Sequence, residues 1–202
     1  MIDLHRHLQD PQETGLSWPQ HMWFASSKCG EWEAISQMQG PSTWRHGYGL
    51  LPDSLDATHM SIDNCAERFS AMLCADRLGY VGEIGLDQRY ENLVTQAEQR
   101  KYALTLMRVA DALQRPIVLH HVGTVDTLID LIRTAQVSVP IILHGYTLSV
   151  ETARTLADFG TIVSLGPGLW FRRTKLAERL HELDVPFVLE TDYPYGIESY
   201  SY

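Results

Sequence analysis

Histidine and carboxylate residues of the metal-ligand type occur at or near the ends of five short apolar stretches of this 202-residue chain. Imidazole and carboxylate groups suit zinc, and also manganese or iron. Each residue alone has an ordinary explanation, because such groups are more often hydrogen-bonded structural residues. As a set they predict a metal site assembled from distant segments. Its predicted ligands are His5, His7, Glu83, His120, His144 and Asp192.

The local spacing of these residues agrees with strands that deliver them to one place. His5 and His7 are two positions apart, so on a strand both side chains point to the same side. Glu83 has glycine on either flank, in Gly82-Glu-Ile-Gly-Leu-Asp87. Two further apolar runs, Pro-Ile-Val-Leu and Pro-Ile-Ile-Leu, each end in histidine. Within each run, strand parity allows the histidine to point inward with an apolar residue below it.

The number of ligands predicts two ions. Six ligands are too many for one tetrahedral metal, and they divide over two ions about 3.5–4 Å apart with a shared carboxylate. Glu83 is the expected bridge because it is central in strand order. The expected cofactors are two divalent ions (zinc, magnesium or manganese). The other ligands divide into His5, His7 and Asp192 for one ion, and His120 and His144 for the other.

A repeated unit of short apolar strand, loop and amphipathic helix is needed to position these side chains. It predicts an α/β fold, a parallel (β/α)₈ TIM-type barrel whose carboxyl-end mouth carries the chemistry. We expect residues 1–202 to form one domain, since this length suits a single barrel. The predicted strands are residues 2–8, 21–26, 46–51, 80–86, 116–121, 140–145, 160–166 and 186–191.

Capping signals and apolar stripes predict the helices. Thr95 with Glu98 forms a capping box, and Ser61 begins an earlier helix. A helix over about 149–159 is followed by Gly160, a plausible C-terminal glycine. Further apolar stripes at helical spacing cover residues 125–132 and 176–183.

The outer ring of helices is expected to be incomplete. Residues 9–20 contain two prolines and a glycine, which leaves no room for a regular helix, and only ten residues follow Asp192. The first and last strands pair in a closed barrel, so these two gaps are neighbours. The result is an uncovered apolar seam that a second copy or a partner subunit would cover. Its outward residues are Ile2, Leu4, Phe187 and Leu189.

Composition limits the class of partner. A formal net charge of −9 argues against extended, non-specific binding of duplex nucleic acid, but it permits a phosphate substrate because a dinuclear metal centre supplies positive charge locally. We find neither a membrane-spanning apolar run nor a secretory signal. The three cysteines have no framework spacing, so we expect reduced thiols, a cytoplasmic location and no membrane partner.

Five segments resemble the successive signatures of the TatD family, metal-dependent hydrolases of the amidohydrolase superfamily. The resemblance spans nearly the whole chain in the right order. It implies a (β/α)₈-type barrel, a divalent dinuclear site with the same division of ligands, and phosphodiester hydrolysis, commonly of DNA from its ends. The segments are Asp3-Leu-His-Arg-His-Leu8, Gly82-Glu-Ile-Gly-Leu-Asp87, Pro116-Ile-Val-Leu-His120, Ile142-Leu-His144 and Leu189-Glu-Thr-Asp-Tyr-Pro-Tyr195.

The chain departs from the family pattern in two loops that help to hold substrate. The family usually has Ser-Arg-Asp after the fifth-strand histidine, where this chain has His121-Val-Gly123. It usually has Cys-Phe-Ser-Gly after the sixth-strand histidine, where this chain has Gly145-Tyr-Thr147. The usual C-terminal helical segment is also missing. The chain is thus a short, divergent member whose substrate its sequence leaves open.

In the expected mechanism a metal-activated water attacks a phosphodiester in line. Asp192 accepts its proton, and Glu83 is the shared carboxylate. Asp3 and Glu190 either orient the imidazole ligands or are ordinary buried carboxylates. Arg172 and Arg173 either contact a phosphate or are solvated. Trp18, Trp23 and Trp170 are candidates for stacking on bases, although core packing is favoured for Trp23.

Two other functions use the same residues. One is a hydrolase of a small amide or lactone; relatives of that kind often carry a bridging lysine where this chain has Glu83. The other is a subunit that acts mainly as a binding module within a larger complex, which the shortened ends and the acidic surface fit. The intact ligand residues argue against a fully inactive enzyme.

Overall fold

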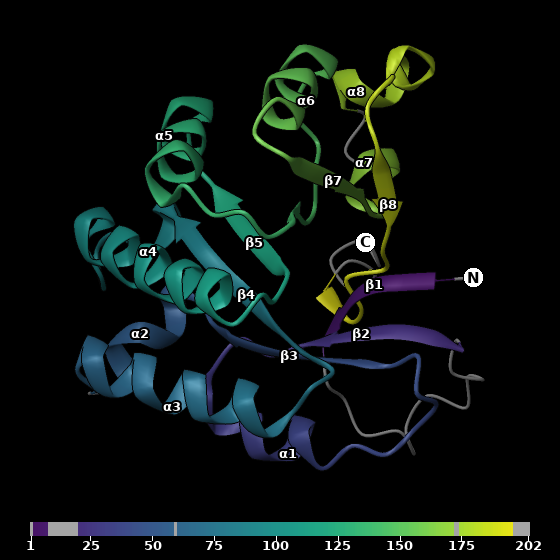
Figure 1. Cartoon of the computed structure of the whole chain (residues 1–202). Helices are drawn as coiled ribbons and strands as arrows, with labels where there is room; N and C mark the ends of the chain where they lie inside the picture. The colour runs from purple at the N-terminus through teal and green to yellow at the C-terminus, as the bar shows by residue number, and fades with distance from the viewer. Residues whose placement is uncertain (1, 8–19, 59, 172–173, 196–202) are drawn as a thin grey trace.

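Eight strands form one parallel sheet in the order β1 to β8 in a computed structural model that describes residues 2–7, 20–58, 60–171 and 174–195 (Figure 1). Each strand coincides with a predicted one, and the predicted barrel is confirmed. The strands are β1 (Ile2–His7), β2 (His21–Ala25), β3 (Arg45–Leu50), β4 (Gly79–Asp87), β5 (Ile117–Val122), β6 (Ile141–Leu143), β7 (Thr161–Leu165) and β8 (Phe187–Leu189).

The sheet curls until its first and last strands meet at the carboxyl-end mouth. The backbone N–H of Asp192 donates to the carbonyl of His5 at 3.0 Å, and that of His7 donates to Tyr193 at 2.9 Å. These bonds lie beyond the end of β8, next to the predicted ligands. Closure of the barrel and assembly of the site therefore depend on the same residues.

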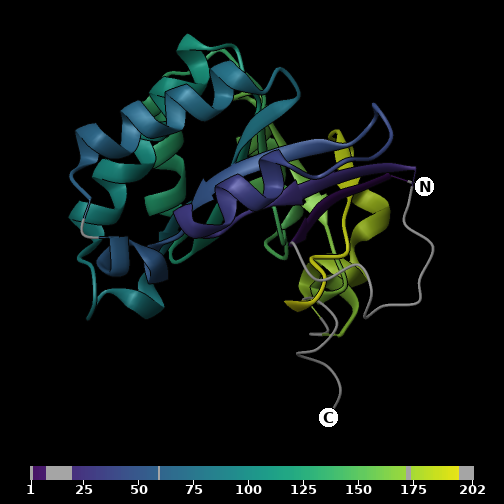
Figure 2. The same cartoon turned by 90° about the horizontal axis from the view of Figure 1, so that it is seen from below.

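Helices cover the outside of the strands. Helices α3 to α5 pack side by side over the central strands, on the left of Figure 1 and of the view from below in Figure 2. The helices are α1 (Trp32–Ser36), α2 (Pro52–Thr58), α3 (Ile62–Ala75), α4 (Gln96–Ala112), α5 (Val125–Ala135), α6 (Val150–Ala157), α7 (Gly168–Phe171) and α8 (Lys175–Glu178). Short 3₁₀ turns η1 (Cys29–Glu31), η2 (Gln88–Tyr90) and η3 (Leu180–Glu182) complete the elements.

The predicted helix starts are confirmed. The Thr95 side chain accepts from the backbone N–H of Glu98, and the Glu98 carboxylate accepts from the backbone N–H of Thr95. At the start of α3, the side chain of Ser61 accepts from the backbone N–H of Asn64. The stripe over 176–183 is not one helix, which corrects that prediction. The backbone leaves helical conformation at Arg179, whose side chain pairs with Glu182 and with a glutamate of α6.

Two apolar layers hold the barrel. The larger lies between the helices and the outer face of the strands. A smaller inner layer, of Tyr80, Val118 and Ile142, fills the barrel below the mouth. The ring of Trp23 packs 4.8 Å from that of Tyr80, so the favoured core role of Trp23 is confirmed. The inner layer forms the floor beneath the polar side chains.

The opposite end of the barrel carries a partly buried polar contact of its own. Asp76, which follows α3, accepts from Nδ1 of His46 at 2.6 Å and from the hydroxyl of Tyr48 at 3.0 Å. Its other oxygen accepts from the backbone of Leu78 at 2.9 Å. These donors satisfy a carboxylate that joins α3 to β3, far from the mouth.

Several predictions fall on residues outside the described part of the chain: the two missing helices, Trp18, Arg172, Arg173 and the side chains of Ile2 and Trp170. Of the apolar seam, Phe187 and Leu189 are 49% and 57% exposed. Among the described residues, no helix is long and apolar enough to cross a membrane.

Candidate metal centre

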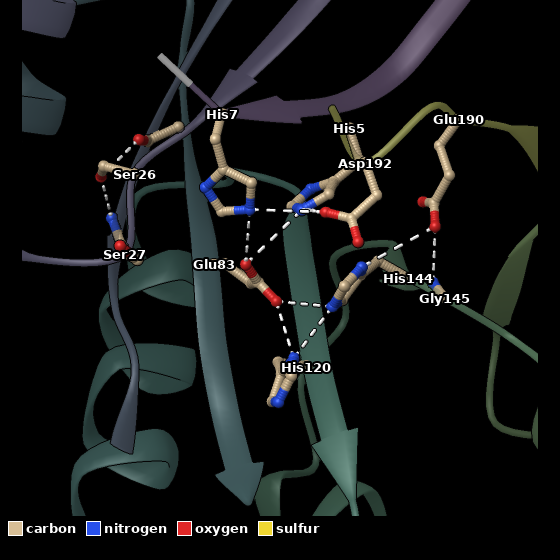
Figure 3. A network of polar contacts seen from close by, with 12 residues as sticks. His5, His7, Ser26, Ser27, Glu83, His120, His144, Gly145, Glu190 and Asp192 are labelled. Carbon is tan, nitrogen blue, oxygen red and sulfur yellow. Dashed lines mark hydrogen bonds and ion pairs between the residues drawn. The ribbon is translucent and has the colours of Figure 1, made fainter. Parts of the chain in front are cut away.

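The structure brings all six predicted ligands together at the mouth, around the carboxylate of Glu83 (Figure 3). Its Oε2 lies 3.5 Å from Nε2 of His5 and 3.3 Å from Nε2 of His7. Its Oε1 lies 2.8 Å from Nδ1 of His120 and 2.5 Å from Nε2 of His144. Each oxygen of one carboxylate thus faces a different pair of imidazoles.

Asp192 completes the group around Oε2. Its Oδ1 lies 3.6 Å from Nε2 of His5 and 3.5 Å from Nε2 of His7. The two groups adjoin, since the rings of His5 and His144 are 4.3 Å apart. This arrangement has the form of the division predicted from the sequence, with Glu83 shared between two sets of donors.

The donor set fits divalent cations. Both ring nitrogens of His5 are buried without a hydrogen-bond partner, and an unpaired buried polar atom costs free energy. Nδ1 of His120 and Nε2 of His144 face each other at 2.9 Å. A cation in each group would accept the lone pairs that now converge, and borderline ligands of this kind suit zinc or manganese.

Charge compensation shifts the pKa of Glu83 and of three of the imidazoles around it, those of His7, His120 and His144. Burial alone would raise the pKa of Glu83, but the imidazoles of His144, His5 and His120 hold it well below the usual value. Burial lowers the pKa of His7, yet Asp192 and Glu83 outweigh it and raise that pKa to about 9. The carboxylates therefore favour the protonated form of the imidazoles of His7, His120 and His144.

Glycines let the strands approach at the level of the ligands. Gly85 follows Glu83 on β4 and has a φ of +154°, and a Cβ there would lie 1.8 Å from the carbonyl oxygen of His120. A Cβ on Gly49 would lie 2.1 Å from the backbone nitrogen of Glu83. A side chain at Gly85 would push β5 away, and one at Gly49 would push β4 away, which explains the glycine two residues after Glu83.

Of the two carboxylates expected to orient imidazoles, Glu190 lies beside an imidazole ring, whereas Asp3 contacts a ligand residue only at the backbone of His5. Oε1 of Glu190 is 3.7 Å from Nδ1 of His144 and accepts from the backbone of Gly145 at 2.6 Å. Asp3 instead accepts from the backbone and the hydroxyl of Thr191, at 2.9 and 2.7 Å. It matches the alternative of a buried hydrogen-bonded carboxylate, and it fixes the backbone next to Asp192.

Sequence reasoning missed one carboxylate. Asp87 ends β4, and its Oδ2 lies 3.0 Å from Nε2 of His120, the nitrogen that faces away from Glu83. The available signal was parity, because Asp87 is four residues after Glu83 on the same strand.

The ligands open into a cavity of about 420 Å³. His121, expected in a loop, belongs instead to the end of β5, and it lies on the cavity wall with Nε2 3.1 Å from the hydroxyl of Thr127. Burial and the neighbouring His120 lower the pKa of His121 to about 4, so it is uncharged at neutral pH. Among the described residues that line the cavity, Arg89 is the only lysine or arginine.

The family model described as TatD related DNase matches residues 2–200. The chain belongs to the TatD family. It is 35% identical to an uncharacterized metal-dependent hydrolase of Methanocaldococcus jannaschii over 118 residues, 57% of this chain and 44% of that protein. It is 26% identical to the uncharacterized metal-dependent hydrolase TatD of Mycobacterium tuberculosis over 152 residues, 72% of this chain and 56% of that one. The chain thus spans about half the length of these relatives.

Solved structures show the same fold. YJJV, a TatD homolog from Escherichia coli K12, superposes with a TM-score of 0.82 at 20% identity, covering 96% of this chain and 80% of that chain. A TatD family hydrolase from Entamoeba histolytica gives a TM-score of 0.73 at 15% identity, covering 95% and 73%. The resemblance to TatD signatures is confirmed, and the barrel is that of the family.

Metal binding should release protons. Because the pKa of His7 is about 9 and that of His144 is raised well above its usual value, a cation must displace protons at neutral pH. Calorimetric titration with Zn²⁺ in buffers of different ionisation enthalpy should show net proton release at pH 7.5 and weaker binding at pH 6. Binding without proton release at pH 7.5 would contradict the charge state of the metal-free site.

Proposed function

We propose that this TatD family member is a divalent-metal-dependent hydrolase that cleaves phosphodiester bonds, with DNA, single-stranded or at its ends, as substrate. The observation that carries the proposal is the shared carboxylate of Glu83, buried between two sets of imidazoles. The description of the family model and the names of the relatives support it.

The ligand sets would hold two ions of zinc, magnesium or manganese. His5, His7 and Asp192 would hold one, His120 and His144 would hold the other, and Glu83 lies between the two sets. When bound, such a pair activates water and neutralises charge on a phosphate. The chain supplies ligand positions on or just after five strands, and a cavity of about 420 Å³ beside them.

Asp192 is the carboxylate best placed to accept a proton. Its side chain is 23% exposed toward the cavity, whereas that of Glu83 is 2% exposed and surrounded by imidazoles. Burial acts to raise the pKa of Asp192, but His7, His144 and His5 lower it, so the group is ionised. Only a group that reaches the water can act as a base during attack.

Aromatic groups at the rim suit a nucleic-acid substrate. Tyr195 is 59% exposed, with its ring 4.8 Å from that of His7, and Tyr90 also lines the cavity. Aromatic rings beside a cationic centre can stack on the terminal bases of a DNA strand whose phosphate enters the site.

Two observations favour alternatives. A cavity of about 420 Å³ with Arg89 as the only lysine or arginine among its described lining residues also suits a small amide or lactone. The exposed Phe187 and Leu189 suit a second copy or a partner subunit, and hence a member that acts within a larger complex.

Asp192→Asn should lower the rate of phosphodiester cleavage by at least about 100-fold, because a neutral amide cannot accept the proton. The measurement is hydrolysis of bis-p-nitrophenyl phosphate and of single-stranded DNA with Mg²⁺, Mn²⁺ and Zn²⁺, with metal content determined for each protein. Asp111→Asn is a matched control, since Asp111 accepts from Ser138 on the surface and should leave the rate unchanged.

Full activity of Asp192→Asn would exclude it as the proton acceptor. Chelation should abolish cleavage by the native protein, and added metal should restore it. Cleavage of p-nitrophenyl esters of carboxylic acids, but not of the phosphodiester, would favour the small-molecule hydrolase.

If a second copy covers the seam, the native protein should dimerise as its concentration rises. Replacing both Phe187 and Leu189 by serine should shift sedimentation toward the monomer without loss of fold. A strict monomer at every concentration would leave the seam to a different subunit, and a dimer unaffected by the substitutions would place the interface elsewhere.

A further inference from the structure

A buried carboxylate outside the proposed ligand set contacts one of the ligands from behind. The side chain of Asp87 is 2% exposed, and its Oδ2 lies 3.0 Å from Nε2 of His120. The other three imidazoles turn Nε2 toward Glu83, whereas His120 turns Nδ1 toward it, at 2.8 Å. The ring of His120 is therefore turned the other way from the other three imidazoles, with Nδ1 rather than Nε2 toward Glu83.

We propose that Asp87 is a positioning residue that fixes the orientation and the tautomer of His120, and so prepares the half of the site formed with His144. The inference rests on the proposed metal site and adds a residue to it.

The chemistry of the contact sets the tautomer. A neutral imidazole has one N–H and one lone pair, and an ionised carboxylate only accepts. With Asp87 at Nε2, the proton belongs on Nε2 and the lone pair on Nδ1. That lone pair points to the place where Oε1 of Glu83 and Nε2 of His144 converge. A metal ligand needs this arrangement, and a carboxylate behind a ligand histidine also raises its basicity.

Arg89 holds the Asp87 carboxylate from the side of the cavity. Its backbone N–H donates to Oδ1 at 3.0 Å, and its Nε donates to Oδ1 at 2.9 Å and to Oδ2 at 3.1 Å. Its Nη2 also contacts Oδ2. Both carboxylate oxygens thus accept from a guanidinium, which balances the charge of Asp87 and fixes the plane of the carboxylate.

Gln99 of α4 holds the backbone of the same residue. Its Oε1 accepts from the N–H of Asp87 at 2.8 Å, and its Nε2 donates to the carbonyl of Asp87 at 3.1 Å and to that of Val94 at 2.9 Å. Gln99 is fully buried, and these hydrogen bonds join α4 to the backbone at the end of β4 and before α4. Arg89 of η2 therefore fixes the carboxylate of Asp87, and Gln99 of α4 fixes its backbone.

Asp87→Asn tests the role. One carboxylate oxygen becomes an NH₂ group, which must then face either the donors of Arg89 or the N–H of His120, so one set of bonds is lost whichever way the amide lies. We expect the weaker step of Zn²⁺ binding to weaken by about 10- to 100-fold, measured by competition with a chromophoric chelator. Arg89→Gln keeps the Asp87 carboxylate but removes the guanidinium that holds it. This variant should lose less Zn²⁺ affinity than Asp87→Asn.

Asp76→Asn is the matched control. It breaks a carboxylate–histidine contact of the same kind at the other end of the barrel, where His46 is 2.6 Å away. It should lower the free energy of unfolding, measured with urea, and leave Zn²⁺ affinity unchanged. A merely structural role for Asp87 predicts that its variants behave as this control does.

A second readout does not depend on affinity. In ¹⁵N-histidine spectra of the zinc-loaded native protein, the His120 signals are identified as those that disappear in His120→Gln. They should have the chemical shifts of a ring protonated at Nε2, and Asp87→Asn should change those shifts. Unchanged affinity and unchanged signals in folded Asp87→Asn and Arg89→Gln would overturn the inference. A native protein that binds no Zn²⁺ would instead overturn the proposed metal site.

Discussion

Burial of the Glu83 carboxylate inside the barrel is the constraint on which the rest of the mouth depends. A buried anion costs several kcal/mol unless charge and hydrogen bonds compensate it. Here the compensation comes from four imidazoles, two carried by β1, one by β5 and one by the residue after β6. In the proposed enzyme two cations would take over this task, with the imidazoles as their ligands. The same arrangement explains the raised pKa of His7 and His144 in the metal-free protein.

Fold closure and site assembly cannot be separated in this chain. Asp3 binds Thr191, and the carbonyl of His5 binds the N–H of Asp192, so residues near both ends of the described chain join at the ligands. Asp192 itself has a φ of +50°, a left-handed conformation that aspartate tolerates better than most residues. Separation of β8 from β1 would therefore open the barrel and, at the same time, remove the carboxylate of Asp192 from the site.

The repeated strand and helix pattern was enough to predict the eight strands, the caps at Ser61 and Thr95 and the convergence of distant residues on one mouth. Apolar periodicity and capping residues are local, so the sequence displays them. The contacts of Asp3 and Asp87 are not local. Strand parity places Asp87 on the side of Glu83, but only the register of β4 against β5, which pairs Gly85 with His120, brings it behind that ring. The break at Arg179 is only partly local, because its side chain pairs both with Glu182 and with Glu151 of α6.

The identity and number of the bound ions decide whether the buried carboxylate has the role described. Diffraction from crystals grown with Zn²⁺, recorded at the zinc absorption edge, measures both directly. Two anomalous peaks are predicted, one between Oε2 of Glu83 and the side chains of His5, His7 and Asp192, the other between Oε1 and those of His120 and His144. No peak within bonding distance of Glu83 would contradict the central claim.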